Sequence, residues 1–292
     1  MTANVYAVVA AAGSGTRLGF DTPKAFVELN GRTLLERSLD GLGASQSIDH
    51  AIVMVSKNMA DHAERILSDP MNRAQWAPMQ VSYEFGSGER FDTVYAGLVA
   101  IQRRLSTAEA NTGGRFVAVH DAARCLTPPA MIAEVVDRAR RGVERGSWYG
   151  AIPVLPVVDT IKVIDAPSSG PRQGQTVVEQ TPDRASLRAA ATPQVFDLET
   201  LIEANEQYLR TTEISSAHPV DQVGASPLPL VTDDASLMEM AGYPVVAVDA
   251  DPLAMKITTP QDFRVAQMIL AGSDAGSAGS GKTPGSGTRR RR

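Results

Sequence analysis

The chain has 292 residues, with 28 Lys or Arg against 33 Asp or Glu, so its formal net charge is -5 at pH 7. This balance argues against a general nucleic-acid surface, because such surfaces neutralise many phosphates with Lys and Arg. The single cysteine, Cys125, excludes an intrachain disulfide and a cysteine metal cluster. The amino terminus has no basic-then-apolar signal and no apolar run reaches ~18 residues, so we expect a cytoplasmic protein with no membrane partner.

The first predicted element is a buried strand formed by the apolar run from Val5 to Ala12. The strand leads into Gly13-Ser14-Gly15, and the basic residues Arg17 and Lys24 follow. Small residues let backbone N–H groups approach an anion closely. Arg17 can fork onto phosphate oxygens, and Lys24 can place a compact positive charge beside them. The stretch therefore indicates a polyphosphate-binding loop.

Other readings of this glycine loop have to be weighed. A Walker loop needs Gly-Lys followed by Ser or Thr, whereas Lys24 follows proline and precedes alanine. A dinucleotide fingerprint needs G-x-G-x-x-G, whereas Gly13, Gly15 and Gly19 are spaced one residue too widely. A tight strand-to-helix turn with an unrelated basic pair is the structural alternative, and the loop alone does not exclude it.

The rest of the chain alternates apolar runs with amphipathic stretches, which predicts the α/β class: a Rossmann-like, mostly parallel sheet with helices on both faces. The expected strands are Ala51 to Val55, Val81 to Phe85, Phe116 to His120, Ala151 to Val154 and Val245 to Val248. The expected helices are Thr33 to Leu42, Ala60 to Leu67, Arg90 to Arg104, Ala130 to Arg141 with Thr127 as its cap, Phe196 to Leu209, Asp234 to Ala241, and one that begins at Thr259-Pro260. Ser68 to Pro78 is expected to be a loop or a poorly patterned insertion, and Thr211 to Leu230 is expected to be a loop.

Two further polar features follow predicted strands, at the edge where open α/β sheets bind ligands. Gly86-Ser87-Gly88 ends one strand as Gly13 to Gly15 end the first, and Asp121 ends the strand from Phe116 to His120. Asp121 is our candidate ligand for Mg²⁺, since this ion prefers carboxylate and phosphate oxygens. A turn or capping aspartate is the alternative.

Two segments differ in pattern from the rest. The stretch 157–191 contains short β-like pieces, Thr160 to Ile164 and Thr176 to Glu179, too thin to bury a core of their own. We expect it to be an arm that packs on a homodimer partner, within a domain of residues 1–271. The tail 272–292 is rich in Gly and Ser and ends in four arginines, so we expect it to be disordered.

Several motifs together resemble one enzyme family. AAGSGTRLGFDTPKAF is similar to the signature loop of nucleotidyltransferases that join a nucleoside triphosphate to a sugar or polyol phosphate. GSGERFDTV, VHDAAR, PVVDTIK, TPQVF, TDDAS and MKITTPQDF then match, in order, the methylerythritol-phosphate cytidylyltransferases of the non-mevalonate isoprenoid pathway. The resemblance covers about Val5 to Leu270 and implies cytidylyl transfer from CTP to methylerythritol phosphate, with release of pyrophosphate.

The resemblance also implies roles for individual residues. The catalytic positions that it indicates are Arg17, Lys24, Arg184 and Lys256. The positions that would bind CTP are Ala11, Ala12, Gly13, Gly15, Ser87, Gly88, Thr93 and Ala122. The positions that would bind the polyol phosphate are Arg124, Thr160 and Thr192, and the metal position is Asp121. His120 is expected to be a neighbour of the site and not a base, because a phosphate nucleophile is already ionised.

Two rival functions remain open at this point. A ribitol-phosphate cytidylyltransferase shares the fold and the chemistry, although the HDAAR and PVVDTIK segments favour the methylerythritol substrate. A catalytically silent nucleotide-binding module is the second rival. The joint presence of Arg17, Lys24, Asp121, Arg184 and Lys256 argues against it, because a silent module has no need of all five.

Overall fold

An eight-stranded sheet forms the centre of the structure, a computed structural model that describes residues 4–13, 18–20, 22–86, 89–107, 115–165, 174–217 and 231–278. The order is β10-β7-β11-β6-β1-β4-β5, with β12 paired to β7. The strands are β1 (Asn4–Ala10), β4 (His50–Val55), β5 (Gln80–Phe85), β6 (Arg115–Asp121), β7 (Gly150–Pro156), β10 (Arg188–Ala190), β11 (Gln194–Asp197) and β12 (Val245–Asp249). The pairs β1–β4, β1–β6, β4–β5 and β7–β12 are parallel, whereas β10 and β11 pair antiparallel to their neighbours.

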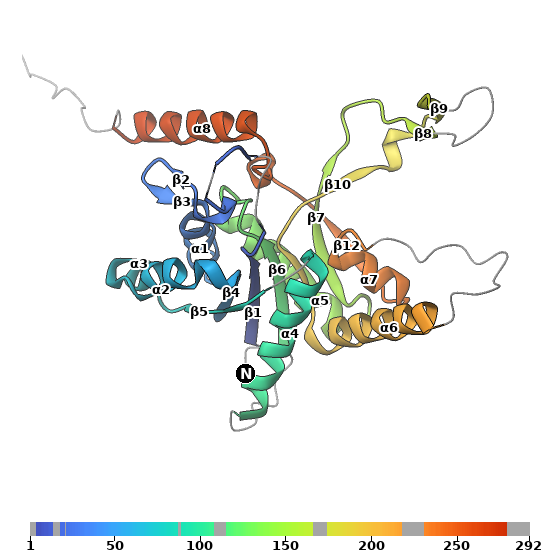
Figure 1. Ribbon diagram of the computed structural model, residues 1–292, viewed down its shortest axis with the longest axis horizontal. Helices are drawn as coiled ribbons and strands as arrows, with labels where there is room; N and C mark the ends of the chain where they lie inside the picture. Colours follow the sequence, from blue (N-terminus) through green and yellow to red (C-terminus); the bar gives the residue numbers. More distant parts are fainter. Residues whose placement is uncertain are drawn as a thin grey trace, which may run out of the picture.

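Helices cover both faces of this sheet (Figure 1). One face carries α1 (Leu34–Ala44), α2 (Ala60–Ser68), α3 (Pro70–Trp76) and α5 (Pro129–Glu144). The other face carries α4 (Arg90–Thr107), α6 (Leu198–Ala217) and α7 (Asp234–Met240). The predicted α/β class, with a mostly parallel sheet between two helical layers, is therefore confirmed. Among the described helices, none combines the length and the apolar character that crossing a bilayer requires.

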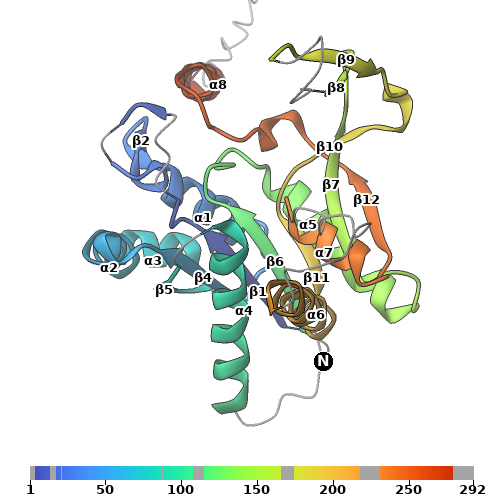
Figure 2. The ribbon, with the colours of Figure 1, turned by 45° about the vertical axis from the view of Figure 1, so that its right-hand side comes forward.

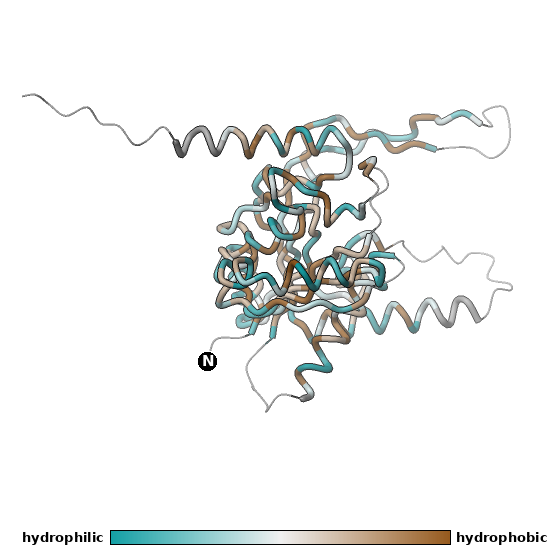
Figure 3. The backbone as a smooth tube through the Cα atoms, turned by 60° about the vertical axis from the view of Figure 1, so that its left-hand side comes forward, coloured by the Kyte–Doolittle hydropathy of each residue, from teal (hydrophilic) through white to brown (hydrophobic). Residues whose placement is uncertain are grey.

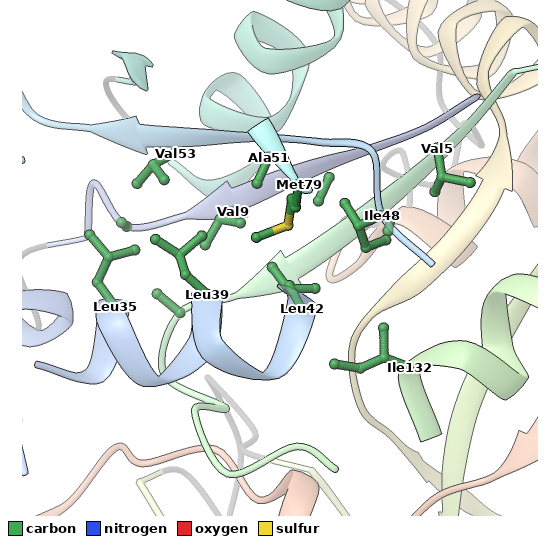
Figure 4. Packing of buried hydrophobic residues seen from close by; sticks show 14 of the residues in the cluster. Val5, Val9, Leu35, Leu39, Leu42, Ile48, Ala51, Val53, Met79 and Ile132 are labelled. Atoms are coloured by element: carbon green, nitrogen blue, oxygen red, sulfur yellow. The ribbon is translucent and has the colours of Figure 1, made fainter. Parts of the chain in front are cut away.

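Strand β1 shows why the sheet needs both layers. Its side chains alternate between the two faces, so that Val5, Ala7 and Val9 belong to one hydrophobic cluster while Tyr6 and Val8 belong to the other. Figure 4 shows Leu35, Leu39 and Leu42 of α1 facing Val9, Val53 and the other apolar side chains of the first cluster. These leucines recur at helical spacing, and they bury the stripe that the sequence predicted. Burial on both faces leaves only the two ends of the strands for function.

The greater part of the segment 157–191 leaves the body of the molecule. Its strands β8 (Val163–Asp165) and β9 (Val177–Gln180) pair antiparallel with each other, away from the main sheet. Figure 2 shows this arm and α8 (Pro260–Ala278) at the same end of the molecule. In contrast to the prediction, the arm does not reach residue 191, because Arg188–Ala190 returns to the main sheet as β10 and pairs with β7.

The stretch from Ser68 to Pro78 was predicted as a loop, and this prediction is wrong. It contains α3, which begins at Pro70 and is capped by Asp69, whose Oδ1 accepts hydrogen bonds from the N–H groups of Met71 and Asn72. Asp followed by Pro is a helix-start signal. The short helix is held by burial of Trp76, a tertiary contact that local pattern does not reveal.

The predicted helix from Phe196 to Leu209 also needs correction. Gln194–Asp197 forms strand β11 between β6 and β7, so Phe196 belongs to the sheet, and α6 begins two residues later. At its other end α6 continues to Ala217, into the stretch predicted as a loop from Thr211. This short segment is a strand because it pairs with two strands that are distant in the sequence. The apolar periodicity within the segment does not reveal that pairing.

Two helix ends differ as well. Thr127 does not cap α5, because the hydroxyl of Thr127 donates to the carbonyl of Arg124 at 2.7 Å. Pro128 occupies the cap position of α5. Helix α8 extends to Ala278, so the first seven residues of the predicted disordered tail are helical. Adding a residue to an existing helix needs no new nucleus, which explains this continuation. Residues 279–292 of the tail lie outside the described part of the chain.

Candidate active site

The glycine-rich loop begins where β1 ends. The N–H of Ala11 donates to the carbonyl of Met54 at 3.0 Å, which ties the end of β1 to β4. Gly13 is exposed, and open space surrounds the position that a Cβ would take. Lys24 begins the turn η2 (Lys24–Phe26) and is half-buried. The predicted residues Gly15 and Arg17 lie outside the described part of the chain.

The second glycine turn meets this loop from the neighbouring strand β5. A Cβ on Gly86 would lie 2.8 Å from Cγ2 of Thr93 and 3.2 Å from Cβ of Ala12. Only glycine therefore allows β5, the first turn of α4 and the loop after β1 to approach so closely. Thr93 is buried, as its position at this junction requires. The structure thus brings together Ala12, Gly86 and Thr93, whereas the predicted residues Ser87 and Gly88 lie outside the described part.

Asp121, the last residue of β6, is the centre of a cationic cluster. Nζ of Lys256 lies 2.8 Å from its Oδ2, and the Nε atoms of Arg90 and Arg124 lie 3.5 Å from Oδ1 and Oδ2 respectively. Burial alone would raise the pKa of Asp121, but the positive charges of Lys256, Arg90 and Arg124 outweigh burial and hold it well below its usual range. Asp121 is therefore an ionised carboxylate at neutral pH.

A cavity of about 220 Å³ opens at this cluster. It is lined by Arg90, Asp121, Arg124, Ala190, Ala191, Thr192, Gln194, Thr232, Asp233 and Lys256. Four of the residues predicted from the sequence, Asp121, Arg124, Thr192 and Lys256, meet there although they come from distant parts of the chain. The predicted residue Ala122 adjoins the cluster, where its N–H donates to the carbonyl of Ala10 at 3.3 Å.

Thr192 and His120 fix the backbone of the aspartate. The N–H of Asp121 donates to Oγ1 of Thr192 at 3.1 Å, and the same Oγ1 lies 3.0 Å from Nδ1 of His120. His120 is fully buried, and burial lowers its pKa to about 4. The ring is therefore neutral at physiological pH and has no exposed surface. This arrangement agrees with the expectation that His120 adjoins the site without serving as its base.

Among the residues that the family resemblance assigns to the polyol phosphate, Arg184 and Thr160 are the two that do not line the cavity. Both are exposed on the arm, and Nη1 of Arg184 donates to the carbonyl of Val158 at 2.9 Å. Neither belongs to the cavity lining. Within one chain, the cavity therefore lacks two residues that the family resemblance assigned to it.

Asp121 was also predicted to hold Mg²⁺. Within the described ranges, no three His, Cys, Asp or Glu side chains are arranged to hold a metal by themselves. Mg²⁺ is commonly held by one or two carboxylates together with substrate phosphates, and an ionised carboxylate that lines a polar cavity suits that mode. The residues present therefore fit a metal that arrives with a polyphosphate.

Three charged residues of the site were not predicted, namely Arg90, Asp233 and Asp234. Nη2 of Arg90 donates to Oδ2 of Asp234 at 2.7 Å, which joins the start of α4 to the start of α7. Arg90 and Asp234 lie in motifs quoted above, GSGERFDTV and TDDAS, and each is the first residue of a helix. Their positions marked them as candidates, but the ion pair joins residues 144 apart in the chain and is not visible in the sequence.

Comparisons with known proteins point in one direction. Residues 5–272 match the sequence profile of the family described as 2-C-methyl-D-erythritol 4-phosphate cytidylyltransferase. A relative of that name from Corynebacterium jeikeium is 86% identical over 94% of this chain and 100% of its own length. Another from Corynebacterium glutamicum is 45% identical over 91% of this chain and 92% of its own. The solved structure of 4-diphosphocytidyl-2C-methyl-D-erythritol synthase from Anaerococcus prevotii superposes with a TM-score of 0.67 at 24% identity, covering 92% of this chain and 96% of that one, and this likeness supports the fold.

Proposed function

This chain belongs to the 2-C-methyl-D-erythritol 4-phosphate cytidylyltransferase family, and from this premise we propose that the cavity at Asp121 is where its two substrates react. The protein is a nucleotidyltransferase. It transfers a cytidylyl group from CTP to 2-C-methyl-D-erythritol 4-phosphate, a step of isoprenoid precursor biosynthesis, and pyrophosphate leaves. The observation that carries the assignment of the site is the cluster of Lys256, Arg90 and Arg124 around Asp121.

The chemistry explains why this site uses cations instead of a general base. The attacking group is a phosphate, which is already ionised, so no proton has to be removed. The two anionic substrates must be held close together and in line, while negative charge increases on the triphosphate. Lys256 and Arg124 would orient the attacking phosphate, with Thr192 beside it. Arg17 and Lys24 would stabilise the charge on the triphosphate, as the family motif indicates.

The nucleotide would lie between the two glycine turns. The close approach of Ala12, Gly86 and Thr93 supports a base site there, because it leaves backbone groups at the carboxyl ends of β1 and β5 to read the base edge. Ala11, Gly13, Gly15 and Ala122 would add main-chain groups around the ribose and phosphates. Ser87 and Gly88 complete this set of proposed contacts.

Magnesium is the cofactor that we propose. Asp121 would hold it, and when bound it would supply charge neutralisation at the phosphates. Nζ of Lys256 contacts Oδ2 of Asp121, and its side chain is 38% exposed and lines the cavity, so it would be within reach of a substrate phosphate bound there. The cytoplasmic location stays a prediction from the sequence.

The arm supports the proposal of a homodimer. It exposes apolar side chains that no core covers, namely Val158, Ile161, Ile164 and Val178. Figure 3 shows the arm extending beyond the body, with apolar positions interspersed among polar ones. Apolar surface gathered on a thin extension is a mark of an interaction site. A two-fold partner would cover it and could bring Arg184 and Thr160 to the other subunit's cavity.

One assay tests the reaction. CTP, ATP, GTP and UTP are each offered with methylerythritol phosphate or ribitol phosphate, with and without Mg²⁺, and pyrophosphate release is measured. We expect release with CTP and methylerythritol phosphate when Mg²⁺ is present. Release only with ribitol phosphate, or only with a purine triphosphate, would contradict the assignment.

A further inference from the structure

Asp234 is a buried carboxylate for which the family motifs offered no role. It is the first residue of α7, and its side chain is only 3% exposed. Capping of α7 does not explain the acid, because Asp233 provides the cap by accepting from the N–H of Ser236. A charge removed from water needs a compensating partner, which here is Nη2 of Arg90 at 2.7 Å.

Arg90 stands between two acids at unequal distances. Its Nη2 hydrogen-bonds Asp234, whereas its Nε lies 3.5 Å from Oδ1 of Asp121, close enough for charge attraction and too far for a hydrogen bond. Burial would lower the pKa of Arg90, but Asp234 and Asp121 raise it above its usual range, so the guanidinium stays charged. The same guanidinium lines the cavity.

The other two cations of the cluster are held differently. Arg124 donates to the carbonyls of Ala254 at 2.7 Å and Ala190 at 3.2 Å, so backbone groups fix it. Lys256 contacts Oδ2 at 2.8 Å. Within the described part of the chain, Oδ1 of Asp121 therefore faces a cation at 3.5 Å and accepts no short hydrogen bond.

We infer that Asp234 is a positioning residue for the transfer reaction. Asp234 holds the guanidinium of Arg90 near Asp121 and prevents this guanidinium from forming a short hydrogen bond with Oδ1 of Asp121. An arginine released from Asp234 has Asp121 as its remaining anionic partner in the cluster. It can then occupy the carboxylate through two parallel hydrogen bonds, a geometry that arginine favours. Asp234 thus keeps one oxygen of Asp121 open to the cavity. The inference rests on the proposed function, because it presupposes that this cavity receives the polyol phosphate.

The test replaces Asp234 by an isosteric neutral residue. We expect Asp234→Asn to lower kcat/KM for methylerythritol phosphate about tenfold or more, while the Kd for CTP, measured by calorimetry, changes less than about twofold. Arg90→Lys should act in the same way, because lysine lacks the planar guanidinium whose Nη2 and Nε face the two acids from separate positions. This variant keeps the test open if Asp234→Asn does not fold. Asp40→Asn is the matched control. Asp40 lies on α1 and pairs with Arg32 at 2.7 Å, and neither residue lines the cavity.

A double-mutant cycle separates positioning from a structural role. If Asp234 acts only through Arg90, then Asp234→Asn has no further effect on kcat/KM in an Arg90→Met background. Independent losses that add in the double variant would overturn the inference, as would a Kd for CTP that rises by the same factor as kcat/KM falls. Wild-type kinetics of Asp234→Asn would overturn it too. Failure of the proposed function looks different, because the wild type and Asp40→Asn would then release no pyrophosphate with methylerythritol phosphate.

Discussion

The charged residues around the cavity balance one another before any substrate is bound. The three positive charges come from Arg90, Arg124 and Lys256. The three negative charges come from Asp121, Asp233 and Asp234, the last of which pairs with Arg90. This cluster alone therefore offers no net positive charge to two anionic substrates. We expect the surplus to come from the residues proposed around the triphosphate, from a partner's arm and from the proposed metal.

Lys24 is the described residue that we propose stabilises the charge on the triphosphate. If it stabilises charge that develops during transfer, Lys24→Ala should lower kcat by ~10²-fold or more, the scale seen when one preorganised donor is lost. Lys57→Ala is a matched control, because Lys57 also begins a short 3-10 turn and is exposed. Steady-state kinetics with both substrates varied provide the measurement. A raised KM with unchanged kcat would show that Lys24 serves ground-state binding only.

The thiol of Cys125 should be inert in the folded protein. Burial raises its pKa to about 12, so at pH 8 almost no thiolate, the reactive form, is present. We expect iodoacetamide to leave Cys125 unmodified in the native state and to modify it fully in denaturant, as read by mass spectrometry. Rapid labelling of the native protein would contradict this burial.

At the scale of elements, α8 packs against the segment that follows the glycine loop. Its start is fixed by a reciprocal cap, in which Asp262 donates its N–H to Oγ1 of Thr259 and accepts the N–H of Thr259 at 2.8 Å. Phe263 then packs in a cluster with Leu18, which follows the glycine loop, and Leu34. The helix therefore supports the segment between Arg17 and Lys24.

The chain beyond α8 should be dispensable for this role. The family match ends at residue 272, and the packed residues of α8 precede that point. We expect a variant that ends at Ala278 to keep the kcat and the melting temperature of the full chain. The arginine run makes salt dependence a useful second readout: a loss of kcat on truncation that high salt also produces would assign the tail an electrostatic role in the reaction.

At the scale of the whole molecule, the arm is the feature that a single chain does not explain. It carries exposed apolar residues and Arg184, yet none of its described residues between 157 and 187 lines its own chain's cavity. A two-fold dimer would resolve both observations, because each arm could then complete the other subunit's site.

A subunit-mixing experiment tests this arrangement. Lys24→Ala and Arg184→Ala are each expected to be nearly inactive as homodimers. If the arm acts in trans, a mixed dimer has one site with both defects and one with none. Random reassortment makes about half of the dimers mixed, so activity should recover to roughly a quarter of wild type. No recovery after verified subunit exchange would contradict the trans assignment and leave Lys24 and Asp121 unaffected.

The sequence by itself determined the fold class, the family and four of the ten residues that line the cavity, namely Asp121, Arg124, Thr192 and Lys256. Each of these depends on local order along the chain. Apolar periodicity predicts strands and helices, and the carboxyl ends of parallel strands share one edge, so Gly13, Gly86 and Asp121 could be placed together in advance. The family resemblance of the ordered motifs then assigned Arg124, Thr192 and Lys256 to the same site, and in the structure all three line the cavity.

Only the tertiary structure decided which distant groups satisfy one another. Gln194–Asp197 became a strand because two remote strands pair with it, and α3 formed around a buried Trp76. The Arg90–Asp234 pair joins residues 144 apart, and no local pattern encodes it. The physical reason is the same in each case. The free energies of strand pairing and of burying a charged pair come from contacts between distant segments. These contacts exist only after the chain has folded.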